Sequence, residues 1–430
     1  MDKIHGNKIV KVRQMLAIGK IEPLLPMDSE LVPLLELASD LRAESILLLS
    51  HVGEQSRPML ASMLRAMNSY YSNKIEGQHT YPADLEDALH RHFSADAEIH
   101  KRQILALAHM AVEEEFEARA RTMTWDAMFT QEWISDLHAS LYARLQEESH
   151  IVLDQHGRER GRFQPGALRR HAVKVGAHIP PEHKLLPDLL AHFHGRYGKV
   201  HYRDVSKIVV AGASLHRLSW IHPFMDGNGR VSRLHNHVLL HHLGLTDGLW
   251  SPMRGLARKQ EEYYGALHQA DLPRRNATDG RGELSSKGLA DFIRFWLDTC
   301  LDQVRFMGQL LRFPEMEARY VNLALLFAHG FGREPVPHHR SILRPELLGK
   351  VLYRLFRAGQ MERSEFKAAL DISDRTATRL ISRLLEQRLI VSEGRVGVLQ
   401  PGFPLGSFRY LFPGLWPEAE VLEMPPIGGG

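Results

Sequence analysis

Cysteine is almost absent from the sequence, and this scarcity limits the chemistry available to the chain. The single cysteine, Cys300, has no second cysteine with which to form an internal disulfide, and it cannot build a thiolate metal site alone. It follows the apolar segment 292–297, so we expect a buried side chain and not a catalytic thiol.

Long apolar runs and a secretory signal are also missing. No stretch approaches the ~20 apolar residues that a membrane span requires. The first residues, Met1–Lys11, are polar and basic and lack the apolar segment of a secretory signal. We therefore expect a cytoplasmic protein with no membrane partner.

A strong net charge is absent as well. Lysine and arginine total 54 against 51 aspartate and glutamate residues, which gives a net charge of +3. This balance is too weak to predict nucleic-acid binding by itself.

Histidine, in contrast, is abundant at 26 residues, and four of them cluster at His235, His237, His241 and His242. His237 and His241 share one face of a predicted helix, which raises the hypothesis of a metal site. No carboxylate or cysteine stands at matching spacing along this segment, so we favour histidines that decorate a partly exposed helix.

A chain of 430 residues exceeds one ordinary core and predicts two or three domains. Turn signals divide it into an N-terminal helical region, a central helical core, a connecting helix with linker, a C-terminal module and a Pro/Gly-rich, poorly ordered tail. Their predicted bounds are 1–115, 116–311, 312–340, 341–405 and 406–430.

The fold class predicted from apolar periodicity is all-α. Apolar residues recur every three or four positions in 56–76, 185–194, 204–220, 230–243 and 289–311, as in packed helices. Segment 171–181 differs, because its alternation and its closing Gly176 and Pro180-Pro181 predict a short β-hairpin flap. Segment 273–287 is polar and predicts an exposed loop.

One loop carries chemistry: residues 222–233, His-Pro-Phe-Met-Asp-Gly-Asn-Gly-Arg-Val-Ser-Arg, join two apolar helices. Gly227 and Gly229 let backbone N–H groups form a concave nest at a helix N-terminus, where the helix dipole favours phosphate. Arg230 and Arg233 project from the first turn in neighbouring directions and can bind two phosphates of one polyphosphate.

The same loop contains a carboxylate and an imidazole. Asp226 would repel phosphate unless a divalent cation such as Mg²⁺ lies between them. His222 can accept a proton from a hydroxyl near neutral pH. The alternative interpretation is a glycine turn with a helix-capping aspartate and solvated arginines.

The complete string resembles the signature of the Fic (filamentation induced by cAMP) family, His-x-Phe-x-Asp/Glu-Gly-Asn-Gly-Arg-x-x-Arg, at every fixed position. The resemblance covers roughly residues 50 to 300 and includes the flap and Tyr263-Tyr264. It implies the Fic helical bundle and AMP transfer from ATP to a Ser, Thr or Tyr hydroxyl of a target protein. Removal of AMP, phosphotransfer and other nucleotide donors remain alternatives.

The resemblance also implies roles for individual residues. His222 would be the base and Asp226 the Mg²⁺ ligand, with Gly227, Asn228 and Gly229 as the anion nest and Arg230 and Arg233 as phosphate clamps. The flap would present the target segment by strand pairing, and Tyr263 would border the adenine. The predicted nucleotide contacts are Glu76, Val175, Gly176, Ala177, His178, Asp226, Gly227, Asn228, Gly229, Arg230, Val231, Ser232, Arg233 and Tyr263.

A carboxylate is expected at the end of helix 56–76. Ser56 can cap this helix, Pro58 suits its first turn and Gly77 can end it, which places Glu76 where the helix dipole disfavours negative charge. The string Ser72-Asn-Lys-Ile-Glu76-Gly77 resembles the inhibitory motif Ser/Thr-x-x-x-Glu-Gly/Asn of Fic proteins. It implies that Glu76 pairs with Arg233 and blocks the terminal phosphate.

Residues 342–403 predict helix, helix, turn, helix and two short strands, 389–391 and 396–399, and resemble a winged helix-turn-helix. Ser373 can cap the third helix, whose apolar stripe is Ala377, Leu380, Ile381, Leu384 and Leu385. Arg375, Arg379 and Arg383 lie on another face. Such a module binds DNA, binds a protein or supports a homodimer, which makes a DNA-binding regulator the alternative function.

Overall fold

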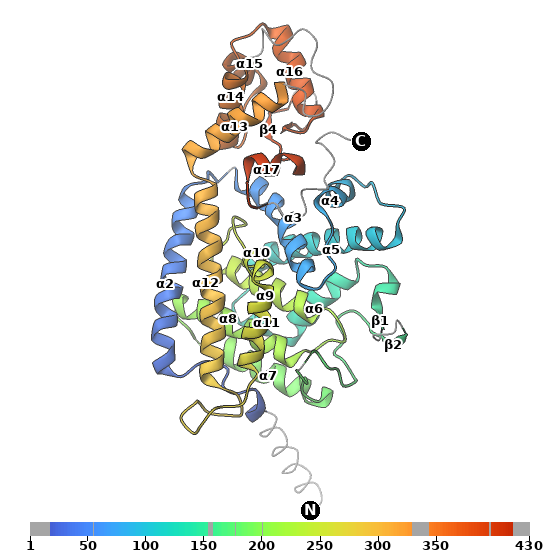
Figure 1. Ribbon diagram of the computed structural model, residues 1–430, viewed down its shortest axis with the longest axis vertical. Helices are drawn as coiled ribbons and strands as arrows, with labels where there is room; N and C mark the ends of the chain where they lie inside the picture. The colour runs from blue at the N-terminus through green and yellow to red at the C-terminus, as the bar shows by residue number, and fades with distance from the viewer. Residues whose placement is uncertain are drawn as a thin grey trace, which may run out of the picture.

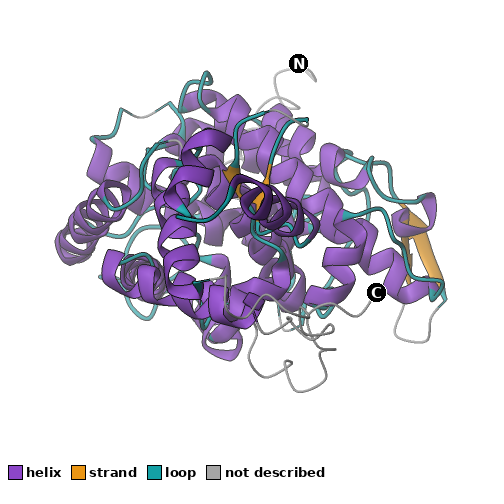
Figure 2. Cartoon of the chain, turned by 90° about the horizontal axis from the view of Figure 1, so that it is seen from above, coloured by secondary structure: helices purple, strands orange, loops and turns teal. Residues whose placement is uncertain are grey.

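Helices dominate the structure. The computed structural model describes residues 18–54, 56–153, 158–176, 178–199, 201–328, 344–394 and 397–415. Within these residues the sheets consist of two short antiparallel strand pairs (Figure 2). The fold is all-α, as the apolar periodicity predicted. Among the described helices, none combines the length and the apolar content needed to cross a membrane.

Two consecutive helices, α8 (Asp204–Ile221) and α9 (Asn228–His242), form the centre of the molecule (Figure 1). Nearly all of α9 and all but the first turn of α8 are buried, because other helices cover them on several sides. The helices that pack against this pair include α5 (Ala97–Ala120), α6 (Gln131–Tyr142), α7 (Leu186–Tyr197) and α12 (Ser286–Leu310). The short loop between α8 and α9 is therefore held from both ends by a rigid core.

Two long helices, α2 (Asp28–Ser50) and α12, lie side by side along one edge of the bundle (Figure 1). Ser285 caps α12, since its side chain accepts a hydrogen bond from Gly288 N–H at 2.9 Å. Cys300 lies on the buried face of α12, as predicted.

Helix α3 (Arg57–Ile75) matches its predicted range closely. Pro58 lies in the first turn, Glu76 is the C-cap residue, and Gly77 follows with a positive φ of 69°. The predicted cap by Ser56 is wrong. The Ser56 hydroxyl is buried and donates to the carbonyl of Phe356 at 2.5 Å, so it serves a contact with the C-terminal module instead.

The remaining elements of the bundle are shorter. They are α4 (Pro82–Leu89), η1 (Asp126–Phe129), η2 (Glu147–His150), η3 (His183–Leu185), α10 (Met253–Arg258), α11 (Gln260–Ala270) and the strands β1 (Ile151–Leu153) and β2 (Glu159–Arg162). The β1–β2 pair, with Ile151 opposite Arg162, was not predicted. The strand β1 has only three residues, all apolar, and β2 is Glu-Arg-Gly-Arg, so neither shows the alternation that marks a half-buried strand.

The C-terminal module contains α13 (Phe313–Ala328), α14 (Pro345–Ala358), α15 (Arg363–Ala369), α16 (Asp374–Glu386), β3 (Ile390–Val391) and β4 (Gln400–Pro401). The order of elements in residues 345–401 agrees with the prediction, but the second strand begins at Gln400. Leu399 is fully buried and bridges to the backbone of Met361 instead. Ser373 makes no side-chain cap, because its hydroxyl pairs with Thr376 Oγ1 at 2.8 Å.

The first part of the segment predicted as a Pro/Gly-rich tail, 406–430, is helical. Residues 405–411 form η4 (Leu405–Ser407) and α17 (Phe408–Leu411), and buried apolar side chains hold this segment against the bundle. The hydroxyl of Tyr71 on α3 donates to Leu415 O at 3.1 Å. Predictions for residues 1–11, Ala177, 329–340, Val396 and 416–430 fall outside the described residues.

Candidate active site

His222 is the first residue after α8, and its backbone is left-handed, with φ 50° and ψ 61°. This conformation ends the helix and turns the chain sharply. The next turn is fixed by Asn228, whose side-chain oxygen accepts from Phe224 N–H and whose amide donates to Phe224 O, both at 2.9 Å. Phe224 is fully buried, as predicted, and anchors the loop in the core.

The imidazole of His222 has one nitrogen engaged. Nδ1 lies 3.3 Å from the carbonyl of Ser219, which accepts a hydrogen bond and therefore keeps the proton on Nδ1. Desolvation lowers the pKa of His222 to about 4. The ring is neutral at pH 7, and Nε2 is left as a proton acceptor.

Asp226 lies at the entrance to α9 and is held by Tyr142, a residue of α6. The Tyr142 hydroxyl donates to Asp226 Oδ2 at 2.8 Å, and the imidazole Nε2 of His138 lies 3.2 Å from Asp226 O. Desolvation disfavours the charged carboxylate, but Arg230, the Tyr142 hydroxyl and the Gly227 N–H outweigh it, so the pKa of Asp226 lies below its usual range. The group is a carboxylate at neutral pH.

Gly227 and Gly229 shape the predicted nest. Gly227 precedes α9 with φ 75°, and the following residue is helical, so consecutive N–H groups turn toward one side. A Cβ on Gly229 would collide with Glu76 Oε1 and lie 3.1 Å from Arg233 Nη1. The nest is thus shaped to let an oxygen atom approach the backbone closely.

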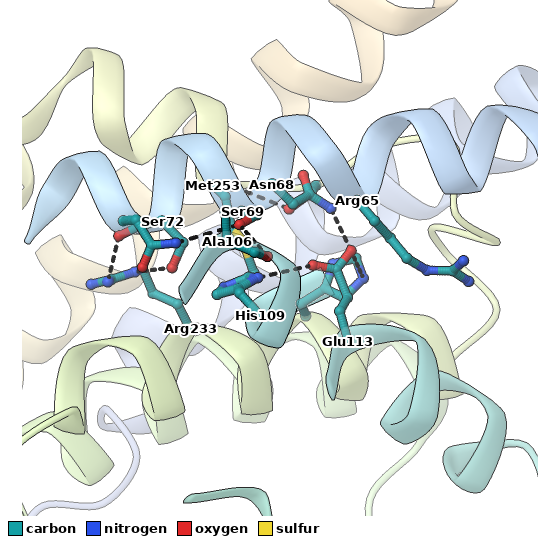
Figure 3. Close-up of polar contacts among 12 residues, drawn as sticks. Arg65, Asn68, Ser69, Ser72, Ala106, His109, Glu113, Arg233 and Met253 are labelled. Atoms are coloured by element: carbon teal, nitrogen blue, oxygen red, sulfur yellow. Dashed lines mark hydrogen bonds and ion pairs between the residues drawn. The ribbon is translucent and has the colours of Figure 1, made fainter. Parts of the chain in front are cut away.

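The two arginines of the loop are buried, and both donate hydrogen bonds to residues of other segments. Arg230 donates to the Tyr142 hydroxyl at 3.1 Å and to Gln78 Oε1. Arg233 donates to Ser72 Oγ at 3.2 Å, to Ser72 O at 2.9 Å and to Glu76 Oε1 at 2.7 Å. Figure 3 shows Ser72 on α3 facing Arg233 on α9. The predicted contact between Glu76 and Arg233 is therefore present.

Comparison with known proteins agrees with this geometry. Residues 128–240 match the model of the Fic/DOC family. This segment of the chain is therefore similar to the Fic/DOC domain. It includes α6, the flap, α8 and the loop from His222 to Arg233.

Curated relatives match over part of their length. The protein adenylyltransferase Fic of Drosophila virilis is 32% identical over 138 residues, which are 31% of this chain and 27% of that protein. The Drosophila melanogaster protein of the same name has the same identity and coverage. The matched segment thus spans about a quarter of these relatives.

Solved structures of Fic proteins are also similar. The crystal structure of a Fic family protein from Desulfovibrio desulfuricans G20 is 17% identical with a TM-score of 0.49, and the match covers 88% of this chain and 98% of that one. A Fic domain containing signaling protein from Bacteroides thetaiotaomicron is 16% identical with a TM-score of 0.48, over 64% of this chain and 96% of that one.

The flap of the Fic/DOC domain is a tight turn and not a pair of strands. Val175 and His178 exchange backbone hydrogen bonds of 3.0 and 2.9 Å around Gly176, whose φ is 58°. His178 anchors the turn, because its Nε2 lies 2.9 Å from Trp220 O and its Nδ1 lies 3.3 Å from Asp271 Oδ2. The exposed Val175 side chain stands beside this turn.

Arg169 joins the flap to the loop 222–233, a contact that the sequence analysis did not predict. Its guanidinium is buried and donates to the carbonyls of His222 at 2.8 Å, His171 at 3.1 Å and Pro181 at 2.5 Å. One side chain therefore fixes both the residue that can accept a proton and the two ends of the flap.

Other residues predicted to contact the nucleotide are buried. The side chains of Val231 and Ser232 point into the core, so these residues can offer only backbone groups to a ligand. Tyr263 is also buried, which raises the pKa of its hydroxyl, and a hydrogen bond with Arg233 opposes that shift. Tyr263 thus supports Arg233 from α11.

Residues missed at the sequence level share one property: they lie far from the loop along the chain. Tyr142, His138, Gln78 and Arg169 belong to other segments, and none of them is a fixed position of a motif. His138 is the clearest case, since it accepts from Gly166 N–H at Nδ1 over 2.8 Å, which leaves Nε2–H to donate to Asp226 O. A sequence pattern within one segment could not have shown this pairing.

The interpretation of the histidine cluster is wrong. His235 and His237 are fully buried, because α9 is enclosed by neighbouring helices. His237 Nε2 lies 2.8 Å from Glu117 Oε1 and 3.5 Å from Glu113 Oε1, two carboxylates of α5. The matching carboxylates exist on another helix, which spacing within α9 could not indicate.

Proposed function

We propose that the chain is a protein adenylyltransferase that transfers AMP from ATP to a Ser, Thr or Tyr hydroxyl of a target protein and releases pyrophosphate. One observation supports it above all: a neutral His222 stands at one end of a glycine nest that carries two buried arginines. The curated relatives that match the Fic/DOC domain are named protein adenylyltransferases.

The transfer would proceed by nucleophilic attack. His222 Nε2 takes the proton of the target hydroxyl while its oxygen forms a bond to the α-phosphorus of ATP. The bond from that phosphorus to the bridging oxygen breaks, and pyrophosphate leaves with the electron pair. Arg230 and Arg233, with the N–H groups of 227–229, stabilise negative charge on the phosphates.

A magnesium ion suits the carboxylate of Asp226. Tyr142 donates to Oδ2 only, and the ionised side chain is exposed at the mouth of the nest, where a hard cation finds an oxygen ligand. The ion would offset the repulsion between Asp226 and bound polyphosphate. Asp226 would hold it together with phosphate oxygens.

We further propose that Glu76 inhibits the resting enzyme. Its carboxylate accepts a hydrogen bond from the Arg233 guanidinium at 2.7 Å and lies against the nest at Gly229. A terminal phosphate would bind at this position. A phosphate can reach Arg233 only when Glu76 withdraws. Residues Ser72, Glu76 and Gly77 form this inhibitory element.

Intact-mass spectrometry of Glu76→Gly, incubated with each nucleoside triphosphate and Mg²⁺, tests the proposal. We expect self-modification by AMP, at a rate well above that of the wild-type chain. The double variant Glu76→Gly, His222→Ala should gain no mass. Transfer of a phosphate or of a different nucleotide would replace the proposed reaction, and absence of any transfer would contradict it.

The exposed face of α16 supports a second function, binding of duplex DNA. Arg375 and Arg379 are exposed one turn apart, whereas Arg383 lies over the ring of Phe327 at 5.7 Å and is not free for DNA. Two phosphate contacts would give salt-dependent retention on duplex DNA. Arg379→Ala should abolish that retention, and Arg383→Ala should leave it unchanged. Equal retention by all three proteins would contradict it.

A further inference from the structure

A cluster of acidic and histidine side chains lies in the core between α5 and α9, outside the nucleotide site. On α5, His109, Glu113 and Glu117 recur every four residues and therefore share one face. On α9, His237 and His241 face them, one and two turns beyond Arg233. All five side chains are buried.

The distances within this cluster suit a metal ion. One ligand atom each from Glu113, Glu117 and His237 can be chosen so that all three lie within 4.8 Å of one another. His237 Nε2 is 2.8 Å from Glu117 Oε1 and 3.5 Å from Glu113 Oε1. Ligands about 2.1 Å from a tetrahedral metal are about 3.4 Å apart, so small side-chain shifts would complete the geometry.

Polar atoms without hydrogen-bond partners also lie in this cluster. His109 is fully buried, and among the described residues neither of its ring nitrogens has a hydrogen-bond partner. Its Nδ1 lies 3.7 Å from Glu113 Oε2, which also lacks a hydrogen-bond partner there, and Figure 3 shows His109 directed at Glu113. Buried polar groups left this way are costly, and a cation between them would satisfy both.

The other carboxylate oxygens are held by a third helix, α3. Asn68 donates to Glu113 Oε1 at 2.7 Å, and Arg65 donates to Glu117 Oε2 at 2.7 Å. These contacts orient both carboxylates, as outer partners do for metal ligands. They leave Glu113 Oε2 without a hydrogen-bond partner among the described residues and Glu117 Oε1 in contact with His237, another ligand of the proposed ion.

An entry path is present beside the cluster. A cavity of about 490 Å³ is lined by Arg65, Glu117 and His241, among others, and reaches the edge of the cluster. A small ion could pass from this cavity to Glu117 without unfolding the core.

We propose that Glu113, Glu117 and His237 bind one divalent transition-metal ion, with His109 beside the fourth coordination position. The combination of imidazole and carboxylate favours Zn²⁺, Mn²⁺, Fe²⁺ or Co²⁺ over Mg²⁺, which retains several water ligands and has little room here. The ion links α5 to α9 one turn from Arg233. This site does not depend on nucleotide transfer.

The test is metal analysis of the tag-free, full-length chain, stripped with chelator and then loaded with Zn²⁺, Mn²⁺ or Co²⁺. We expect one equivalent per chain, a visible absorption band with Co²⁺ and a rise in Tm of roughly 5 °C with Zn²⁺. Glu113→Gln and Glu117→Gln should each bind at least about 100-fold more weakly. Glu114→Gln, a change at the exposed neighbour, and Asp226→Asn, a change at the active site, should bind as the wild type does.

Several results would overturn the site. They are failure of the wild-type chain to bind any of the three ions, or full binding by the double variant Glu113→Gln, Glu117→Gln. X-ray absorption of the loaded wild-type chain keeps the test decisive if the variants do not fold. Coordination by imidazole and carboxylate supports the site, and coordination by water oxygens alone contradicts it.

Discussion

Arg233 and Glu76 lie 157 positions apart in the sequence, yet the Arg233 guanidinium donates to the Glu76 carboxylate at 2.7 Å. The two side chains differ in how exposed they are and in how firmly their helices hold them. The side chain of Arg233 is 2% exposed and is fixed within α9, whereas that of Glu76 is 32% exposed and belongs to the C-cap residue that follows α3. Glu76 is therefore the partner that can leave, and a phosphate can take its place.

Glu76→Gln should separate the charge of this contact from its shape. A glutamine fills the same space but loses the charge-assisted hydrogen bond, which contributes about 1.5–3 kcal/mol and equals roughly 10- to 100-fold in binding. We expect ATP to bind more tightly by about that factor, measured by calorimetry with Mg²⁺. Glu76→Gly should bind at least as tightly, and unchanged affinity in both variants would exclude Glu76 as an inhibitor.

The inhibition should also resist mild acid. Burial disfavours the charge on Glu76, but Arg233 and Arg230 outweigh it, so the pKa of Glu76 lies below 4.5. The contact is therefore fully formed above pH 4.5 and is lost only as the pH falls through that lower pKa. The ratio of Glu76→Gly to wild-type activity should stay constant from pH 8 to pH 5.5, and a ratio that falls toward pH 5.5 would contradict this assignment.

The effect of Gly229→Ala on the free energy of unfolding should change sign with the residue at position 76. In the wild-type chain the added Cβ collides with Glu76 Oε1 and weakens its contact with Arg233, so we expect destabilisation of about 1 kcal/mol. In the Glu76→Gly background that collision is gone, and alanine within a helix is favoured by about 0.5–1 kcal/mol. Urea unfolding of the four proteins measures the cycle, and the same sign in both backgrounds would refute the close approach.

Local patterns predicted those parts of the structure in which interacting residues lie close in sequence. The ranges of α3, α8, α9 and α12 followed from apolar spacing, because residues three or four positions apart share a helix face and are buried together. The turn at Gly227 was likewise predicted from residues that lie close in sequence. So was the position of His222, Asp226, Arg230 and Arg233 in one loop. The contact between Glu76 and Arg233 was predicted only because residues 72–77 resemble a motif of a known family.

Contacts between distant segments could not be predicted this way. Arg169 reaches three carbonyls from separate turns, and Glu113 and Glu117 meet His237 across two helices. Likewise, α17 packs against α13, and Gly414 and Leu415 beyond it accept hydrogen bonds from Arg254 and Tyr71, which a Pro/Gly-rich composition does not reveal. Such pairings depend on tertiary packing, and no single segment encodes them.

Arg169→Met should loosen both the flap and the catalytic loop. Methionine fills part of the volume but leaves the carbonyls of His222, His171 and Pro181 without their donor. Buried acceptors left unpaired predict a loss of about 2–4 kcal/mol in the free energy of unfolding. Arg170→Met, at the exposed neighbouring position, is the matched control for urea unfolding and should change it by less than about 0.5 kcal/mol. Equal stability of the two variants would show that Arg169 does not hold these segments.

The pH dependence of the rate should follow the unusual state of His222. Desolvation lowers the pKa of His222 to about 4, so the base is unprotonated from pH 8 down to about pH 5 and is lost only as the pH falls through that value. In the Glu76→Gly background, kcat/KM for AMP transfer should therefore be flat with respect to this group between pH 8 and pH 6, since kcat/KM reports the free enzyme. Ser219 contributes only a backbone carbonyl to Nδ1, so Ser219→Ala should leave the profile unchanged and serves as the control. An acidic limb with its midpoint near 6.5 would mean that the imidazole is hydrated and ordinary, and that burial does not prepare His222 as the base.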